Sequence, residues 1–142
     1  MTDTRSNIEL VERWLAAFSE RWPATEELEG LLAPDFEFVE RPNLFSPAGG
    51  TRAREQSLAG AVAGQGVLAW QRYTVLAHLA DGDEVATRFR WDGELKVDAG
   101  ALARGTRLTA WCVAHYVVRD GRIARVEQHD CYEAPVPPDA AR

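Results

Sequence analysis

The sequence predicts an α+β fold in which N-terminal helices pack on one face of a strongly curved, mainly antiparallel sheet. The first part of the chain carries apolar residues at helical spacing: Ile8, Val11, Trp14, Leu15, Phe18 and Trp22. The second half instead alternates apolar and polar residues, with Asp-Gly turn signals between the alternating runs. Because helices come first and strands second, we expect the two kinds of element to form separate layers.

The N-terminal helix is expected to begin at a capping box formed by Ser6 and Glu9 and to end before Pro23. A shorter helix then precedes Pro34, and a strand is broken by Pro42. A third helix is closed by glycines. The expected ranges are 25–32 for the second helix, 35–41 for the strand and 51–63 for the third helix.

Four strands are expected in the second half, joined in pairs by short turns. The first turn is Asp81-Gly82-Asp83 and the second is Asp120-Gly121. The expected strands cover 68–80, 84–92, 106–119 and 122–133. The whole chain, 1–142, is expected to be one domain with an ordered core over about 6–134 and a loose Pro- and Ala-rich tail over 135–142.

Composition excludes several classes of function. The chain has 16 Lys and Arg against 22 Asp and Glu, for a net charge of −6. Without a basic cluster it is not expected to bind nucleic acid. No run approaches the ~18 apolar residues of a membrane span, and the first residues lack a signal region, so we expect a cytoplasmic protein. Cys112 and Cys131 are too few for a structural zinc site, and no metal or cofactor is expected.

The turn of the last hairpin predicts which residues of its two strands share a face. If Asp120-Gly121 is a two-residue turn and the register continues without interruption, one face carries polar groups among aromatic rings. We take this face as the inward one. Its members include Trp111, His115, Gln128, Asp130 and Tyr132.

The first hairpin alternates between aromatic residues and arginines. Phe89 and Trp91 are expected to face inward, and Arg88 and Arg90 outward. On the partner strand the expected inward residues are Tyr73, Val75, Ala77 and Leu79. Together with Trp14 and Phe18, the inward surface is rich in aromatic side chains. A few polar groups on an aromatic wall are typical of a small-molecule pocket; a filled core is the alternative.

The other face of the last hairpin is expected to be small and apolar. An exposed apolar sheet face needs a cover, and a second copy of the chain is the simplest one. This predicts a homodimer through the outer sheet face. The residues assigned to that face are Leu108, Ala110, Cys112, Ala114, Tyr116 and Cys131.

Several segments resemble the nuclear transport factor 2-like superfamily, in its SnoaL-like branch of polyketide cyclase and ketosteroid isomerase-like proteins. The resemblance covers about 7–133, and the segments that carry it are Val11 to Phe18, Leu32 to Phe36, Val39 to Pro42, Gly50 to Ala53 and Arg119 to Ile123. It implies a cone-shaped α+β barrel with helices over a curved sheet, a deep apolar cavity and commonly a homodimer. Since members differ widely in activity, the fold implies no single reaction.

Two catalytic patterns of the superfamily are absent. The isomerase pattern requires a Tyr where Trp14 stands, an Asp where Arg41 stands, and an acid near Val113. The limonene epoxide hydrolase pattern requires Arg and Asp where this chain has Phe89 and Trp91, and a second Asp where it has Gln128. The cyclase branch commonly places an acid at that last position, and Asp130 lies one step further along the same face.

Asp130 is therefore the leading candidate for general acid–base catalysis, and His115 is expected either to take part in proton transfer or, with Gln128, to orient the substrate. The two side chains are not expected to meet, because about 13 Å separates their positions along the hairpin. We expect a cofactor-independent enzyme of the isomerase, cyclase, hydratase or dehydratase type that binds a small apolar cyclic or polyketide-like compound. A non-catalytic ligand-binding or interaction module is the alternative. Whether Glu40 or Arg41 faces the pocket stays open. The expected binding residues are Trp14, Phe18, Phe38, Arg41, Tyr73, Phe89, Trp91, Trp111, Gln128 and Tyr132.

Overall fold

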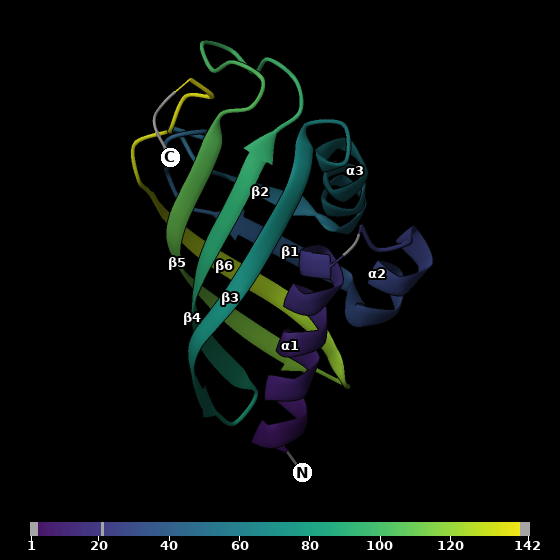
Figure 1. Cartoon of the computed structure of the whole chain (residues 1–142). Coiled ribbons are helices and arrows are strands. Elements are labelled where there is room, and N and C mark those ends of the chain that lie inside the picture. The colour runs from purple at the N-terminus through teal and green to yellow at the C-terminus, as the bar shows by residue number, and fades with distance from the viewer. Residues whose placement is uncertain (1–2, 21, 140–142) are drawn as a thin grey trace.

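The computed structural model describes residues 3–20 and 22–139 (Figure 1). Three helices lie on one side of a curved six-stranded sheet, which confirms the predicted α+β class. The elements are α1 (Thr4–Glu20), α2 (Thr25–Leu31), β1 (Leu32–Glu40), β2 (Gly50–Ala53), α3 (Arg54–Gly64), β3 (Leu68–Asp81), β4 (Glu84–Leu95), β5 (Arg107–Arg119) and β6 (Arg122–Tyr132).

The sheet is mixed and does not close into a barrel. Its strand order is β2-β1-β6-β5-β4-β3, so β1 is inserted between β2 and β6. The β1–β6 pair is parallel, and all the other neighbouring pairs are antiparallel. None of the helices in the described part of the chain is long and apolar enough to cross a membrane.

Helix α1 begins two residues earlier than its expected cap. The Asp3 carboxylate accepts hydrogen bonds from the Arg5 amide at 3.0 Å and the Ser6 hydroxyl at 2.7 Å. Asp3 therefore caps the helix, and the prediction of a capping box at Ser6 is wrong because Ser6 already lies in the first turn. An Asp in this position satisfies amides that have no partner within the helix.

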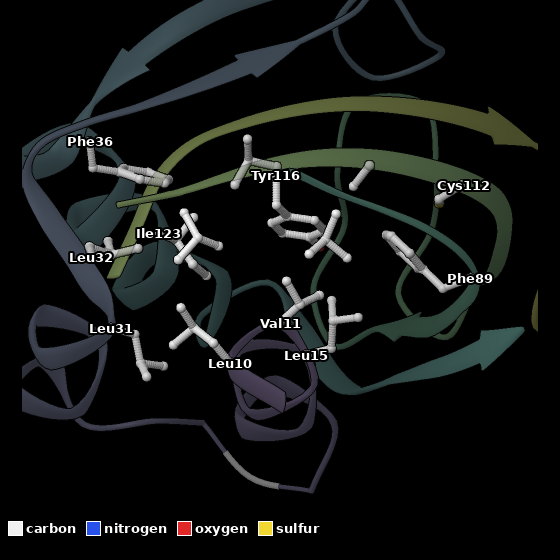
Figure 2. Close-up of a cluster of buried hydrophobic side chains, with 14 of the residues drawn as sticks. Leu10, Val11, Leu15, Leu31, Leu32, Phe36, Phe89, Cys112, Tyr116 and Ile123 are labelled. Carbon is white, nitrogen blue, oxygen red and sulfur yellow. The ribbon is translucent and has the colours of Figure 1, made fainter. Parts of the chain in front are cut away.

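The main core lies between α1 and the strands β4, β5 and β6. In Figure 2, Leu10, Val11 and Leu15 of α1 point toward Tyr116 and Ile123 on the sheet. All five side chains are almost fully buried. Burying an aliphatic side chain of this size contributes about 1.5–3 kcal/mol to folding, so this contact holds the helix layer on the sheet.

Strand β2 was not expected from the sequence. The predicted helix over 51–63 instead begins at Arg54, and the four residues before it pair antiparallel with β1, with Arg52 opposite Phe38. The pairing satisfies the hydrogen-bonding groups on the otherwise open edge of β1. A segment of four residues carries too little periodicity to be recognised as a strand.

The C-terminal tail is attached to the sheet at one point. Arg107 and Val136 form an isolated bridge in which each amide donates to the other's carbonyl at 2.9 Å. The loose tail expected over 135–142 is thus held at Val136, and residues 140–142 lie outside the described part. This bridge keeps the chain against the end of β5.

The predicted turn of the last hairpin is confirmed, but the register between its two strands changes at Ala124. Asp120 and Gly121 both have positive φ, at 53° and 73°, and Arg119 pairs with Arg122. A β-bulge at Ala124 then shifts the pairing by one position. Beyond the bulge, the even-numbered residues of β5 share a face with the even-numbered residues of β6.

The predicted orientation of the β5 side chains is therefore wrong. Ala110, Cys112, Ala114 and Tyr116 point toward the helices and are buried, whereas they were expected on the outer surface. They already have their cover in α1, so the apolar surface that suggested a homodimer does not exist. The physical reason is the bulge, because a shift of one residue exchanges the two faces of a strand pair. The two cysteines now lie on opposite faces, with Cys112 buried and Cys131 exposed.

A second bulge changes part of the first hairpin. On β4 the inward alternation is as expected and includes Phe89 and Trp91. On β3 the register shifts between Val75 and Ala77. Ala77 and Leu79 consequently face outward, with Leu79 78% exposed, and the prediction that they face inward is wrong.

The same shift turns His78 toward α1. Its Nδ1 lies 2.8 Å from the Thr87 hydroxyl and its Nε2 lies 3.0 Å from a carboxylate oxygen of Glu12. His78 therefore links β3, β4 and α1. This side chain has a structural role between the layers.

Candidate functional site

A cavity of about 360 Å³ lies between the sheet and the helices α1 and α3. Its volume falls at the lower end of the range of about 300–1,000 Å³ that small-molecule sites occupy. Residues from both helices and from all six strands contribute to its wall. The cavity borders the core of Figure 2, with which it shares Leu15 and Cys112.

Aromatic rings form most of the apolar wall. Trp14 and Phe18 of α1 meet edge to face at 5.1 Å between ring centroids, and Phe18 lies 6.3 Å from Tyr73 of β3. Trp91 of β4 and Tyr132 of β6 also meet edge to face, at 6.2 Å. Such contacts fix the rings relative to one another and keep the wall rigid.

Trp91 is held in place by two neighbours. Its indole Nε1 donates a hydrogen bond of 2.9 Å to the side-chain oxygen of Gln71, which is itself buried. A Cβ at position 93 would lie 2.8 Å from the indole ring, so only a glycine at that position leaves room for it. Gln71 and Gly93 are cross-strand partners, and together they position the indole ring of Trp91 in the wall.

Three polar side chains form a row along one side of the cavity. Glu40 of β1 is paired with Gln128 of β6, and Gln128 is followed on the same face by Asp130. The Gln128 amide donates to both carboxylate oxygens of Asp130, at 3.0 and 3.3 Å. Asn43 donates to Glu40 at 3.3 Å. The row places two carboxylates beside the same hollow, with an amide between them.

Arg52 stands at the end of this row. Its guanidinium lies 4.8 Å from the centroid of the Phe38 ring, and its Nη1 lies 3.8 Å from a carboxylate oxygen of Glu40. The separation from Glu40 is too long for a hydrogen bond. The β1–β2 pairing brings Arg52 here, since it is the cross-strand partner of Phe38.

Asp130 lies opposite Cys112, its cross-strand partner on β5. Burial raises the pKa of the Cys112 thiol far above its ordinary value, and the charge of Asp130 raises it further. Burial, followed by the same charge, also raises the pKa of the Tyr73 and Tyr132 hydroxyls. All three groups therefore keep their protons at neutral pH and can act as hydrogen-bond donors around the carboxylate.

Eight of the predicted site residues lie in the cavity wall. Asp130 and Gln128 are among them, and so is each aromatic residue expected from α1. The eight are Trp14, Phe18, Phe38, Tyr73, Trp91, Gln128, Asp130 and Tyr132. Their side-chain directions follow from alternation along single strands and from helical spacing, which is why the sequence was sufficient to place them.

His115 and Trp111 lie on the outer face of the sheet, so their prediction as cavity residues is wrong. The Nε2 of His115 forms an ion-pair contact of 2.8 Å with Glu84, and the Trp111 indole donates to Glu133 at 2.7 Å. Trp111 is 45% exposed. The bulge at Ala124 is the cause, because it places the odd-numbered residues of β5 on the side away from the helices.

Arg41 and Phe89 also lie outside the cavity wall. Arg41 turns away from the cavity and donates to Glu127 at 2.6 Å, while Glu40 turns inward, which resolves the open alternative between the two. Phe89 is fully buried in the core. Alternation from Phe36 through Phe38 to Glu40 continues to the end of β1, and no bulge there turns Arg41 inward.

Sequence reasoning missed several cavity residues, among them Gln71, Arg52 and Cys112. Gln71 has a signal that could have found it, since it lies two positions before Tyr73 on the same strand. Arg52 had none, because its strand was not recognised, and Cys112 was assigned to the wrong face. Within residues 3–20 and 22–139, no three His, Cys, Asp or Glu side chains come together in a way that could hold a metal ion.

The sequence of this chain matches one family profile over most of its length. The profile is described as a SnoaL-like domain and covers residues 11–126. No curated protein matches the chain significantly.

Solved structures with the same fold include proteins from several bacteria. IdmH of Streptomyces antibioticus, described as a proposed polyketide cyclase, is 25% identical with a TM-score of 0.72, and the match covers 87% of this chain and 91% of that one. A proposed ketosteroid isomerase of Kribbella flavida is also 25% identical, with a TM-score of 0.61 and coverages of 100% and 88%.

A third match extends the same fold to a more distant relative. A proposed SnoaL-like polyketide cyclase of Jannaschia sp. CCS1 is 16% identical, with a TM-score of 0.73 and coverages of 89% and 86%. At this identity the match concerns the fold alone. The nuclear transport factor 2-like fold expected from the sequence is confirmed, with the qualification that the sheet is open.

Proposed function

We propose that this chain, which belongs to the SnoaL-like domain family, is a cofactor-independent enzyme acting on a small apolar cyclic or polyketide-like compound by general acid–base chemistry. One observation carries the proposal: Asp130 lies in the wall of an aromatic cavity, beside neutral hydrogen-bond donors. A carboxylate in this setting can take a proton from a bound substrate. His115 has no part in the proposed site, because it lies on the outer face.

The surroundings of Asp130 supply the other parts of such a reaction. The carboxylate would accept a proton from a carbon next to a carbonyl, and the electrons of the broken C–H bond would move to the carbonyl oxygen. Tyr73 and Tyr132 keep their protons, so either hydroxyl can donate to that oxygen. Gln128 orients the carboxylate through its two hydrogen bonds. Returning the proton from Asp130 to a different carbon completes an isomerisation. In a dehydration the C–O bond to a β-hydroxyl breaks, and the departing oxygen takes the proton from Asp130 and leaves as water.

The two carboxylates of the cavity have different surroundings. Glu40 is next to the guanidinium of Arg52 and accepts a hydrogen bond from Asn43. Among the described residues, no Lys, Arg or His forms an ion pair with Asp130. Groups with different environments tend to take different roles in acid–base chemistry. Asp130 is therefore the stronger candidate for proton transfer, and Glu40 is proposed to bind or orient the substrate.

Proton transfer can be measured without knowing the natural substrate. The probe is 1-tetralone, an apolar bicyclic ketone, whose exchange of α-protons for deuterium is followed by NMR in heavy water. The unmodified chain should accelerate exchange, and Asp130→Asn should reduce the acceleration by roughly 10²–10⁴-fold. His115→Asn is the matched control on the outer face and should exchange like the unmodified chain. Exchange at the full rate in Asp130→Asn would remove Asp130 from the mechanism.

A second candidate function is ligand binding without chemistry. It is favoured by Trp14, which lies in the cavity wall where the isomerase pattern requires a tyrosine. Saturable binding of 1-tetralone with no accelerated exchange, and no product from other apolar ketones, would select this alternative.

We also propose a homodimer through the outer sheet face. Its contact residues differ from those expected from the sequence. Trp111 and Val113 of β5 and Leu79 of β3 are exposed on that face. Apolar side chains in such positions are typical of surfaces that associate. Analytical ultracentrifugation of the unmodified chain and of Val113→Lys would test it; a monomer at all concentrations would exclude it.

A further inference from the structure

The charge balance of the cavity wall is negative. Its charged residues are two carboxylates, Glu40 and Asp130, and one guanidinium, Arg52. The guanidinium lies beside Glu40 and over the ring of Phe38, so its charge is directed to one end of the row. At neutral pH the wall therefore carries one negative charge more than positive, and Asp130 holds it.

The hydrogen bonds that Asp130 receives come from neutral donors. Gln128 donates from its side-chain amide, and the thiol of Cys112, the cross-strand partner of Asp130, stays protonated and uncharged. Hydrogen bonds from neutral donors satisfy some of the acceptor positions of a half-buried carboxylate, but they leave its negative charge uncompensated. The complementary partner of such a group is a cation in the cavity itself.

The field of Asp130 reaches across the cavity. Its charge contributes to the raised pKa of Tyr73 on β3 as well as that of Tyr132 on its own strand. The space between these rings therefore has a negative potential, which disfavours an anionic ligand and favours a cationic one.

The aromatic wall adds a second attraction for positive charge. The faces of Trp, Tyr and Phe rings attract ammonium and guanidinium groups within about 6 Å of the ring centroid. Arg52 already shows this contact in the same cavity, at 4.8 Å from the Phe38 ring. Trp14, Trp91 and Tyr132 offer further rings around the hollow.

We propose that the cavity selects ligands that carry a protonated or quaternary amine on an apolar body, with the ammonium group between Asp130 and the rings of Trp91 and Tyr132. The inference deepens the proposed function and rests on its ligand-binding cavity, because it names a class of substrate or inhibitor for the same site.

A pair of probes with one shape and two charges tests the proposal. Choline and 3,3-dimethylbutan-1-ol differ in that a positively charged nitrogen replaces a carbon. Binding is measured by calorimetry and by tryptophan fluorescence at neutral pH. Choline is expected to bind the unmodified chain about tenfold or more tightly than the neutral alcohol, since charge pairing and the ring contacts together exceed about 1.4 kcal/mol.

Variants separate the two attractions. Asp130→Asn preserves the shape of the side chain and should reduce the preference for choline to the smaller one that the ring contacts provide, while leaving binding of the alcohol within about twofold, as expected for an isosteric change that removes only charge. Trp91→Leu should weaken choline binding, and Trp111→Leu, on the outer face, should not. Circular dichroism confirms that each variant is folded.

The outcomes separate this inference from the proposed function. Equal affinity of the unmodified chain for both probes would overturn the amine preference and leave the cavity proposal standing. If neither probe binds and 1-tetralone does not bind either, the ligand-binding cavity itself fails, and the proposed function fails with it. A preference for choline that is undiminished in Asp130→Asn would also overturn the inference.

Discussion

Cys112 and Asp130 face each other across β5 and β6 on the cavity side of the sheet. This pairing exists because Ala124 bulges out of β6; an uninterrupted register from the Asp120-Gly121 turn would instead place Asp130 opposite Trp111. One extra residue therefore decides that a thiol, rather than an indole, lies beside the carboxylate. It also leaves the small side chain of Ala110 in the cavity wall, opposite Tyr132.

The three tyrosines predict an unusual response to alkaline pH. Burial raises the pKa of Tyr73, Tyr116 and Tyr132 well above the ordinary value of 10.0. Because the folded state then keeps protons that the unfolded state releases, the associated stability is present below pH 10 and is lost as the pH rises above it. Little tyrosinate should be seen by ultraviolet absorbance until the chain unfolds.

The control for this titration is the chain unfolded in urea, in which the tyrosines should ionise near pH 10. Far-ultraviolet circular dichroism, recorded on the same samples, reports unfolding. Full tyrosine ionisation near pH 10 with an unchanged dichroism spectrum would contradict the prediction.

Tyr116→Phe is expected to stabilise the protein or leave its stability unchanged. The Tyr116 hydroxyl is fully buried and makes no hydrogen bond with the described residues. An unsatisfied buried hydroxyl is destabilising by about 1–3 kcal/mol, so its removal should raise the free energy of unfolding by about 1 kcal/mol. Urea unfolding provides the measurement. A loss of more than about 1 kcal/mol would show that the hydroxyl has a hydrogen-bond partner.

Gly93→Ala should displace Trp91 from the cavity wall. The added Cβ would lie 2.8 Å from the indole ring, which must then move and lose its hydrogen bond to Gln71. We expect a loss of about 1–3 kcal/mol of stability, as for other overpacked sites, together with altered tryptophan fluorescence.

The matched control for this substitution is Gly30→Ala in α2, where no atom lies within 4 Å of the added Cβ. Replacing a helical glycine by alanine should stabilise the chain by roughly 0.5–1 kcal/mol. Equal effects of the two substitutions would contradict the assigned role of Gly93.

Arg41→Gln should change the acid titration of Glu127 without changing the cavity. The Arg41 side chain donates to Glu127 and holds the pKa of that carboxyl below its usual value of 4.5. A lowered pKa in the folded state adds stability above the usual value that is lost as the pH falls through the lowered one. In Arg41→Gln the pKa of Glu127, followed by NMR, should rise toward 4.5. An unchanged pKa, or weakened ligand binding, would contradict this placement.

The elements that the sequence predicted well are those with strong local signals. Alternation of inward and outward residues along β4 was enough to place Trp91 inward, and helical spacing was enough to place Trp14 and Phe18. The positive φ values of Asp120 and Gly121 confirm the turn that this Asp-Gly pair predicts. In each case neighbouring residues supply the whole signal.

The sequence by itself therefore determined the class of fold, the order of its elements, and the inward direction of Gln128, Asp130 and Tyr132. Only the tertiary structure decided what lies beside them: Cys112 and not Trp111, Glu40 and not Arg41, and Arg52 from an unrecognised strand. The physical reason is that a bulge and an edge strand form where distant backbone groups find hydrogen-bond partners and apolar side chains meet α1. Those gains depend on contacts between strands and appear in no local period of the sequence.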